Sequence, residues 1–188
     1  MESRIVLFLG KPGSGKGDQT KLLSEATGWP VVSTSAGMRE IAANGGAVGH
    51  KLKETMDAGI LTPYWLAAYV YLKTILGIPE NGSIIFDGTT RTPPEAEIVL
   101  QSLTWLNKPF TIFHLVVSDE EIKARIALRK EKEARADDHA VDMRLAEYYA
   151  STNKAIDVVR QAGLLTEING ERTREEIAAD IRAVLGIA

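Results

Sequence analysis

Residues 5–17 of this chain read IVLFLGKPGSGKG, an apolar run followed by a glycine-rich turn and a lysine. The run is typical of a buried strand, and the turn from Gly10 to Lys16 has the phosphate-loop spacing G-x-x-x-x-G-K. Glycines lack side chains and let backbone N–H groups converge on phosphate oxygens at the start of the next helix. The stretch predicts a phosphate-binding loop in which Lys16 is a mobile positive charge. An ordinary glycine-rich turn is the alternative, and Gly17 stands where serine or threonine usually completes the pattern.

The composition is that of an ordinary globular protein, with 188 residues, 45% hydrophobic and 25% charged, and predicts a single domain. A net charge of −3 argues against a broad surface for nucleic acid or membrane lipid. The absence of cysteine excludes disulfides and cysteine zinc sites and fits the cytoplasm. The first strand begins within four residues of the N-terminus, which leaves no room for a signal peptide, and no apolar run has membrane-spanning length. We expect a cytoplasmic protein.

Short apolar runs alternate with longer helical patterns along the chain. The expected strands are Ile5–Leu9, Val31–Ser33, Ser83–Phe86, Thr111–Val117 and Leu164–Ile168. Continuous apolar strands suit a parallel sheet covered by helices on both faces. Strand–helix alternation with a phosphate loop after the first strand predicts an α/β fold, a doubly wound parallel five-stranded sheet of the P-loop NTPase type. Ligands are expected at the carboxyl ends of its strands.

Helix signals are also clear. Capping-box starts occur at residues 118–121 and 173–176, and one apolar stripe predicts a long helix that ends at Gly163; its members are Leu145, Tyr149, Thr152, Ile156 and Val159. His114, inside an apolar strand, is expected to be a hydrogen-bonded core histidine. The tryptophans are interpreted as packing residues; they are Trp29, Trp65 and Trp105.

Two segments do not fit the alternating core. Residues 34–62 carry helical pieces broken by glycines, and residues 130–138 are all polar or small. A mobile flap is the functional interpretation of the second segment, and a solvated charge run is the alternative.

Charged side chains accumulate where ligands are expected. Asp87 follows the strand at 83–86, at the place where P-loop proteins hold magnesium, usually through water, although a turn-forming Asp-Gly pair is the alternative. Six arginines lie near the same edge, and arginine is suited to clamping phosphates; they are Arg39, Arg91, Arg125, Arg129, Arg135 and Arg144. Each by itself is more simply a surface residue. Ser14 has no histidine base at motif spacing, so a hydrolase triad is unsupported.

Several segments together resemble the adenylate kinases, within the nucleoside monophosphate kinases, over nearly the whole chain. The phosphate loop has the glycine after lysine that is characteristic of this family, and further segments are similar to its monophosphate site and to the edges of a short, zinc-free lid. These segments are residues 10–17, 32–39, 56–63, 87–93, 125–129 and 135–138. The resemblance implies a monophosphate-binding subregion at 34–62 and a short lid at 129–138.

The resemblance also implies reversible phosphoryl transfer from Mg-ATP to AMP by a monomer that needs no zinc. Residues implied for ATP are Gly13, Ser14, Gly15, Lys16, Gly17, Asp18 and Arg125, with Arg125 stacked on adenine. Residues implied for the monophosphate are Thr34, Arg39, Ile60, Leu61, Thr62, Gly88, Arg91 and Glu95. Asp87 would organise Mg²⁺ through water, as the resemblance implies. Residues implied for catalysis are Lys16, Arg91, Arg129, Arg135 and Arg144.

Three departures from the family pattern lead to specific expectations. Asp18 replaces a threonine beside the phosphates, and we expect its charge to lower ATP affinity or raise the magnesium requirement. Glu95 replaces a glutamine that reads adenine; an ionised glutamate only accepts hydrogen bonds, so we expect weaker adenine selectivity. Only five residues separate Asp138 from Arg144, two fewer than usual, so either the intervening loop is shorter or Arg144 points elsewhere.

Two alternatives to an adenylate kinase stay open at this point. One is a kinase for another nucleoside monophosphate such as GMP, CMP or UMP. The other is a degenerate nucleotide-binding protein without turnover, which the departures favour and the set of arginines opposes.

Overall fold

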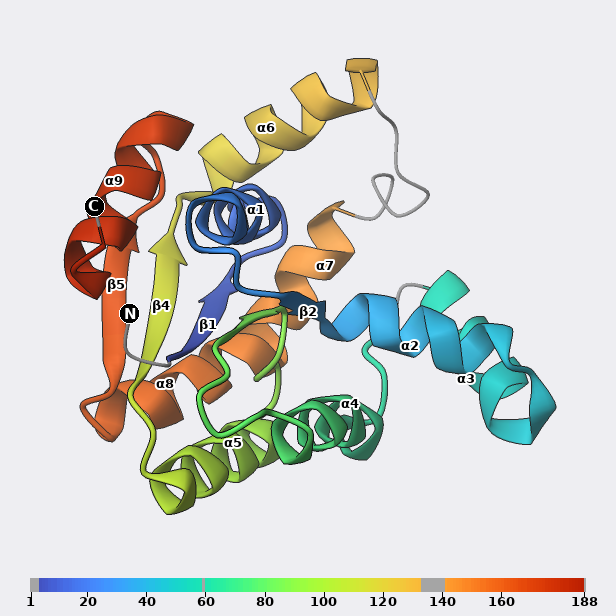
Figure 1. The fold of residues 1–188 in the computed structure, drawn as a ribbon. Helices are drawn as coiled ribbons and strands as arrows, with labels where there is room; N and C mark the ends of the chain where they lie inside the picture. The colour runs from blue at the N-terminus through green and yellow to red at the C-terminus, as the bar shows by residue number, and fades with distance from the viewer. Residues whose placement is uncertain (1–3, 59, 133–140, 188) are drawn as a thin grey trace.

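The computed structural model describes residues 4–58, 60–132 and 141–187. Its centre is a single sheet of five parallel strands in the order β2-β3-β1-β4-β5 (Figure 1). The strands are β1 (Ile5–Gly10), β2 (Val31–Ser33), β3 (Ile84–Asp87), β4 (Phe110–Val116) and β5 (Leu165–Asn169). Each lies within one residue of its expected position, so the predicted α/β fold with a doubly wound parallel sheet is confirmed.

Helices connect the strands and cover both faces of the sheet. They are α1 (Lys16–Thr27), α2 (Thr34–Ala43), α3 (Gly46–Asp57), α4 (Tyr64–Leu76), α5 (Pro93–Leu106), α6 (Asp119–Lys132), α7 (Val141–Glu147), α8 (Asn153–Gln161) and α9 (Arg174–Leu185). A single π-helical turn, η2 (Tyr148–Thr152), joins α7 to α8. Among the described residues, no helix combines the length and apolar character that crossing a membrane requires.

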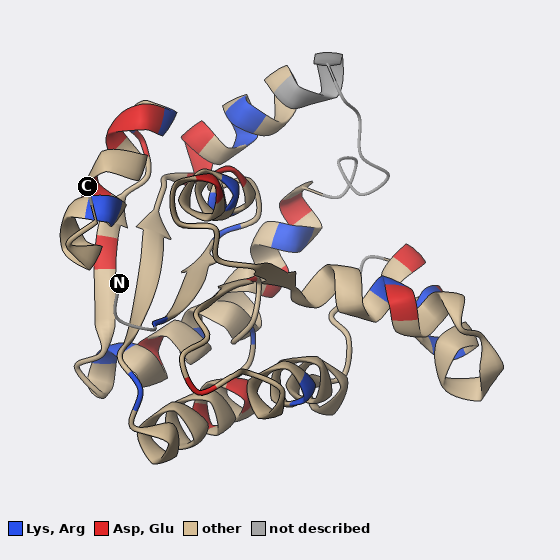
Figure 2. Ribbon diagram, in the orientation of Figure 1, with Lys and Arg blue, Asp and Glu red and all other residues tan. Residues whose placement is uncertain are grey.

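Alternating residues of β1 divide the core into two layers. Ile5, Leu7 and Leu9 pack with α4, α5 and α8, whereas Val6 and Phe8 pack with α1 and α9. All five side chains are at most 2% exposed, because β1 is the central strand and both of its faces are covered. Figure 2 shows the strands largely free of charged residues, which lie mostly on the helices and loops. The centre of the sheet is therefore buried and apolar, and polar side chains that could bind a ligand lie at its edges.

Helices α2 and α3 form an arm that projects from the body beside β2 (Figure 1). A separate apolar cluster attaches the arm to α4; its buried members are Met38, Leu52, Leu66, Ala67 and Val70. Gly37 lies at this contact, where a Cβ atom would come within 2.7 Å of Val70 Cγ1. Residues 34–43 and 46–57 of the segment expected as a monophosphate-binding subregion are thus helical and packed on α4.

The long helix expected to end at Gly163 is present, but η2 changes which side chains it buries. Tyr148 is 4% exposed, whereas Tyr149, expected in the buried stripe, is 47% exposed. A π-turn contains an extra residue relative to an α-helix, and this shifts the buried stripe. Leu145, Ile156 and Val159 are buried as expected.

The predictions for the cap of α9 and for His114 are confirmed, whereas those for the tryptophans are only partly right. The capping box of α9 is present, because Thr173 and Glu176 exchange hydrogen bonds. His114 is a buried, hydrogen-bonded core histidine, as expected. The packing interpretation holds for Trp29, which is buried, and is wrong for Trp65 and Trp105, which are 54% and 84% exposed. Both lie on faces of their helices, α4 and α5, that the rest of the chain leaves more than half exposed.

The contact at Gly37 leads to a stability prediction. Gly37→Ala gains roughly 1 kcal/mol of helix propensity but forces a methyl group against the stiff Val70 side chain, at a cost of about 1–3 kcal/mol. We expect a net loss of about 1 kcal/mol in the free energy of unfolding, measured by urea denaturation. Gly77→Ala at the end of α4 is the control, because its Cβ would meet only ordinary contacts at 3.5 and 3.6 Å. A Gly37→Ala variant as stable as the parent would contradict this packing.

Candidate active site

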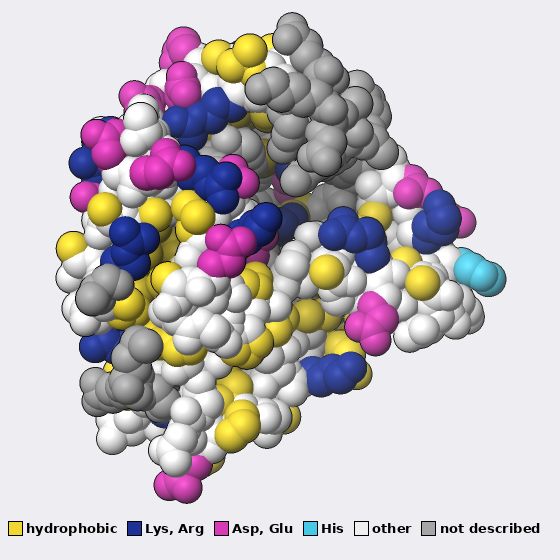
Figure 3. Space-filling model, turned by 45° about the horizontal axis from the view of Figure 1, so that its top comes forward, with side chains coloured by type: hydrophobic (Ala, Val, Ile, Leu, Met, Phe, Trp, Pro, Cys, Tyr) yellow, Lys and Arg dark blue, Asp and Glu magenta, His cyan; other side chains and the backbone are white. Residues whose placement is uncertain are grey.

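The phosphate loop connects the end of β1 to the start of α1, at the carboxyl edge of the sheet. Gly13 has a φ of +81°, and a Cβ there would lie 3.1 Å from Ile126 of α6. Gly15, the N-cap of α1, has a φ of +92°, a conformation that side chains other than glycine rarely adopt. The loop therefore turns tightly into the helix, with its backbone close against α6. Figure 3 looks down on this edge and shows Lys and Arg side chains around a central hollow, with the arm on the right.

The Lys16 ammonium is held inside this loop. It donates hydrogen bonds to the carbonyl oxygens of Gly10 and Lys11, both at 2.8 Å, and lies 3.4 Å from Ser14 Oγ. Burial lowers the pKa of Lys16 to about 8, the nearby Asp87 carboxylate opposes this, and the positive charges of Arg91 and Arg144 add to it. One carboxylate and two guanidinium groups, from separate elements, thus act on the same ammonium.

Asp87 is the last residue of β3 and pairs in register with Phe8 of β1. A Cβ atom on Gly17 would lie 4.0 Å from Asp87 Oδ2, so this carboxylate faces the start of α1. Asp18, in the first turn of α1, is exposed. Carboxylate oxygens are the ligands that Mg²⁺ prefers, so the two residues fit a magnesium-nucleotide. No cluster of three or more His, Cys, Asp or Glu residues suited to a metal ion occurs within residues 4–58, 60–132 and 141–187.

Arg91 follows β3 in a sharply turned segment. Its Nε donates to the Gly88 carbonyl at 3.0 Å, and a Cβ on Gly88 would lie 3.0 Å from Arg91 Nη2. Gly88 has a φ of +77°, and Thr90, a residue without glycine's freedom, has a φ of 64°. The turn folds the guanidinium back over the strand end and toward Lys16.

Glu95 holds this turn in place. Its carboxylate accepts hydrogen bonds from the Arg91 backbone N–H at 2.9 Å and from the Thr92 hydroxyl at 3.1 Å. The residue is 4% exposed, and burial raises the pKa of Glu95 despite these bonds. Sequence reasoning expected this side chain at the base of the monophosphate. In the structure, both of its oxygens accept hydrogen bonds from the segment that carries Arg91, so the carboxylate closes the N-terminus of α5.

The remaining residues expected at the monophosphate lie on the arm and its connection to α4. Thr34, the first residue of α2, is 4% exposed, and its hydroxyl has no hydrogen-bond partner within the described chain. Arg39 is exposed on α2. Ile60 is 60% exposed, and Leu61 and Thr62 are half-buried in the connection. A buried hydroxyl without a partner is costly, so Thr34 is a natural acceptor of a ligand contact.

Arg125 on α6 lies across the phosphate loop from the arm. Its guanidinium donates to Glu121 at 2.6 Å and to the Gly170 carbonyl at 2.8 Å, and reaches the Ser14 carbonyl at 3.5 Å. It thereby links the phosphate loop to the turn after β5. Sequence reasoning missed this turn, whose Gly170 is packed so closely that a Cβ would lie 2.6 Å from Val117 Cγ2.

The structure describes the three arginines around the expected lid to different extents. Arg144 lies on α7, and its positive charge contributes to lowering the pKa of Lys16. The backbone of Arg129 belongs to α6. Arg135 lies outside the described residues, as does most of the expected lid at 129–138.

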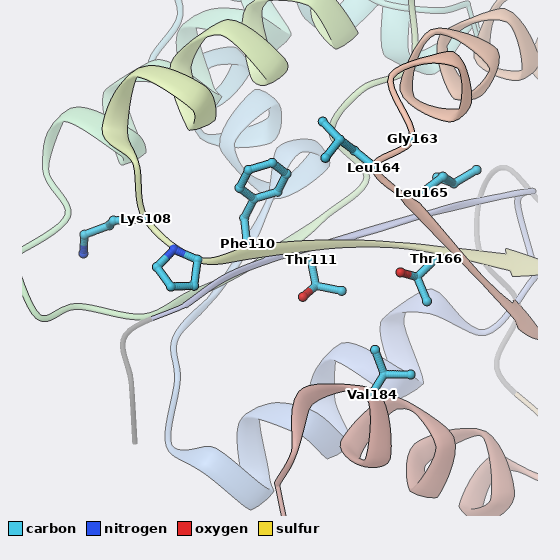
Figure 4. Close-up of a pocket in the computed structure, with 9 residues that line it drawn as sticks. Lys108, Phe110, Thr111, Gly163, Leu164, Leu165, Thr166 and Val184 are labelled. Carbon is cyan, nitrogen blue, oxygen red and sulfur yellow. The ribbon is translucent and has the colours of Figure 1, made fainter.

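Two surface hollows adjoin the ends of β4 and β5. One, of about 540 Å³, lies at the carboxyl edge beside Lys11 and is also lined by Ser118, Asn169 and Glu171. The other, of about 400 Å³, lies at the amino edge (Figure 4), where Lys108 points away from the cavity. Lys108 donates instead to the carbonyl oxygens of Pro79 and Gly82. The phosphate loop and its charges adjoin only the first hollow.

The central phosphate loop, with Lys16 beside Asp87 at the carboxyl edge of a parallel sheet, defines a P-loop nucleotide-binding protein. A family model described as adenylate kinase matches residues 8–164. The chain is 33% identical to an adenylate kinase of Leptospira biflexa serovar Patoc over 94% of this chain and 96% of the relative. It is 34% identical to those of Maricaulis maris (96% and 97% covered) and Thermus thermophilus (98% of both chains).

The chain therefore belongs to the adenylate kinase family. It is an enzyme that transfers a phosphoryl group between ATP and a nucleoside monophosphate, and the family uses ATP together with Mg²⁺. The expectation of a nucleoside monophosphate kinase is thus confirmed.

The buried cap formed by Glu95 leads to a prediction about pH and stability. Because burial raises the pKa of Glu95 above its ordinary 4.5, the folded protein binds more protons than the unfolded chain between these two pKa values. The contribution of Glu95 to the free energy of unfolding must fall as pH rises through that interval. In Glu95→Gln the amide oxygen can accept from the Arg91 N–H and the amide nitrogen can donate to the Thr92 hydroxyl, without titration.

We therefore expect the parent to lose stability relative to Glu95→Gln as pH rises above 4.5, measured by urea denaturation at several pH values. Glu97→Gln, at an exposed position on the same helix, is the matched control. A parent–variant difference that stays constant with pH would show that Glu95 is not held in this buried cap.

Proposed function

We propose that the phosphoryl acceptor is AMP and the donor is Mg-ATP, so that the reaction forms two ADP. The observation that supports this most directly is that the charges of Asp87, Arg91 and Arg144 all act on the Lys16 ammonium. A protein that only binds a triphosphate needs cationic side chains on one side of the phosphates. Guanidinium groups from the turn after β3 and from α7, on separate elements around the lysine, fit a phosphoryl group that moves between two nucleotides.

Each part of the site has a role in this proposal. Backbone N–H groups of residues 13–17 and the Lys16 ammonium hold the ATP phosphates, and Arg125 contacts the ATP base. Arg39, Arg91 and the unpartnered Thr34 hydroxyl receive the monophosphate. Arg144, with Arg129, neutralises charge on the transferring group. Catalysis then rests on positioning and electrostatics, because the acceptor phosphate is itself the nucleophile.

Asp87 and Asp18 would hold the magnesium that accompanies ATP, directly or through water. When bound, Mg²⁺ neutralises part of the phosphate charge. Asp87 also sustains the positive charge of Lys16, since its carboxylate opposes the effect of burial on that pKa. The same carboxylate thus serves the ammonium and the metal.

The monophosphate site selects adenine weakly in this proposal. A glutamine can both accept from and donate to the adenine edge, but a carboxylate offers only acceptors. The Glu95 oxygens are, in addition, already used by the Arg91 N–H and the Thr92 hydroxyl. Adenine therefore gains no paired hydrogen bonds from this position, and a base with donors on that edge, such as guanine, is penalised less.

The substrate test is the initial velocity with ATP and each of AMP, GMP, CMP, UMP and their deoxy forms. We expect AMP to have the highest kcat/KM, with a preference over GMP reduced to about tenfold, which is about one lost hydrogen bond. A chain that prefers another monophosphate outright would contradict the assignment of AMP, and an undiminished AMP preference would contradict the role given to Glu95.

Asp18 leads to a prediction about magnesium. Its exposed carboxylate places a negative charge beside the triphosphate, which a metal ion offsets. Asp18→Thr is expected to bind ATP without magnesium about three- to tenfold more tightly than the parent, while Mg-ATP affinity changes less. Calorimetric titration with and without Mg²⁺ measures both. Glu25→Gln, on the same helix and ion-paired with Lys21, is the control; equal metal dependence in Asp18→Thr and the parent would refute the effect.

A further inference from the structure

The side chain of Lys11 belongs to the phosphate loop but is turned away from Lys16. Its ammonium donates to Asp119 Oδ1 at 2.5 Å, and the Lys11 side chain is only 14% exposed. Asp119 is the first residue of α6. A lysine of the loop is thus committed to an ion pair with a helix outside the loop, and the mechanism above does not use it.

Tyr149 completes this group from a third element. Its hydroxyl donates to the same Asp119 oxygen at 2.8 Å, and Lys11 Nζ lies 5.3 Å from the centre of the Tyr149 ring. Both distances are those of favourable contacts, a charge-assisted hydrogen bond and a cation–π interaction. We call these three residues, Lys11, Asp119 and Tyr149, the clasp.

The charges of the clasp are stable near neutral pH. Burial acts against the Lys11 ammonium, but hydrogen bonds with Asp119 and Tyr149 raise the pKa of Lys11 overall. The hydrogen bond from Lys11 lowers the pKa of Asp119. Both groups therefore remain ionised near neutral pH, and the ion pair between them persists there.

The π-turn determines the position of the Tyr149 side chain. The preceding residue, Tyr148, is buried and its hydroxyl lies 3.3 Å from His114 Nε2, while His114 Nδ1 lies 3.3 Å from Glu167. The two tyrosine rings meet edge to face with centroids 5.4 Å apart. Tyr148 anchors the turn in the core, and its neighbour is thereby presented to Asp119.

The backbone carbonyl of Lys11 connects the clasp to the ATP site. The Lys11 carbonyl accepts a hydrogen bond from Lys16 Nζ at 2.8 Å and one from the Ser14 N–H at 3.2 Å. The residue that the clasp holds by its side chain is therefore the one that orients the Lys16 ammonium by its carbonyl. Movement of Lys11 would alter both the lysine and the curvature of the loop.

We propose that Asp119 and Tyr149 are positioning residues for ATP, which act through Lys11 to hold the phosphate loop in its binding conformation. The clasp also makes α6 and η2, on either side of residues 133–140, part of the loop's support. The inference rests on the family's use of ATP and not on the identity of the monophosphate.

The test compares two clasp variants, Tyr149→Phe and Asp119→Asn, with the parent in Mg-ATP titrations without a monophosphate. Tyr149→Phe keeps the ring and removes only the hydroxyl of a half-exposed side chain, so folding is preserved. Asp119→Asn removes the charge. We expect each to weaken Mg-ATP binding about three- to tenfold and to raise the KM for ATP in parallel, while the KM for the monophosphate changes less than about twofold.

A second pair of variants separates charge from packing at Lys11. Lys11→Met should lose ATP affinity as Asp119→Asn does, and Lys11→Arg, which keeps the cation, should restore most of it. The control is Lys123→Met, because Lys123 is an exposed lysine of α6 whose ion pair, with Asp142 of α7 at 2.9 Å, includes no residue of the clasp.

Unchanged ATP affinity in Tyr149→Phe and Asp119→Asn overturns the proposal. A loss in thermal stability without a loss in ATP affinity, or an equal effect in Lys123→Met, overturns it as well, because the clasp would then be only structural. Since ATP binding is measured alone, these outcomes do not depend on whether AMP is the acceptor.

Discussion

Parallel pairing of β1 with β3 is the constraint on which the site depends. The register sets Phe8 opposite Asp87, and both strands end at the same edge. The loop that leaves β1 is thereby brought beside the carboxylate that ends β3, and the charges of that carboxylate and of two arginines act on Lys16. The pairing is secured by apolar contacts on both faces of β1. Hydrophobic burial in the middle of the sheet therefore determines the electrostatics at its edge.

A second consequence is that several polar side chains serve the site by holding other residues. Glu95 caps the turn that carries Arg91, and the clasp holds the residue whose carbonyl orients Lys16. Burying a polar group without a partner costs free energy of folding. Each of these hydrogen bonds and ion pairs therefore restricts the conformations of the residues that it joins. The arm formed by α2 and α3 is supported differently, by an apolar cluster on α4 that carries no charge.

Much of the fold and part of the site could be predicted from local sequence. The five strands are continuous apolar runs, and glycine spacing identifies the phosphate loop without any tertiary information. Asp87 and Arg91 could be singled out because they lie at the end of an apolar strand and shortly after it. The predictions that failed concern exposure: Trp65, Trp105 and Tyr149 are apolar in character, yet which face of a helix is covered depends on its neighbours and, for Tyr149, on an extra residue in a π-turn.

By itself, the sequence determined the class of fold, the phosphate loop and the resemblance that the family match confirmed. These depend on short-range patterns, namely apolar runs and residue spacing within one loop. Only the tertiary structure decided that the charge of Arg144 acts on Lys16 and that the Glu95 carboxylate accepts hydrogen bonds at the start of its own helix. It also decided that Lys11 is paired with Asp119, 108 positions away in the chain. Such contacts join elements distant in sequence, and no local pattern specifies them because the packing of whole helices on the sheet sets their geometry.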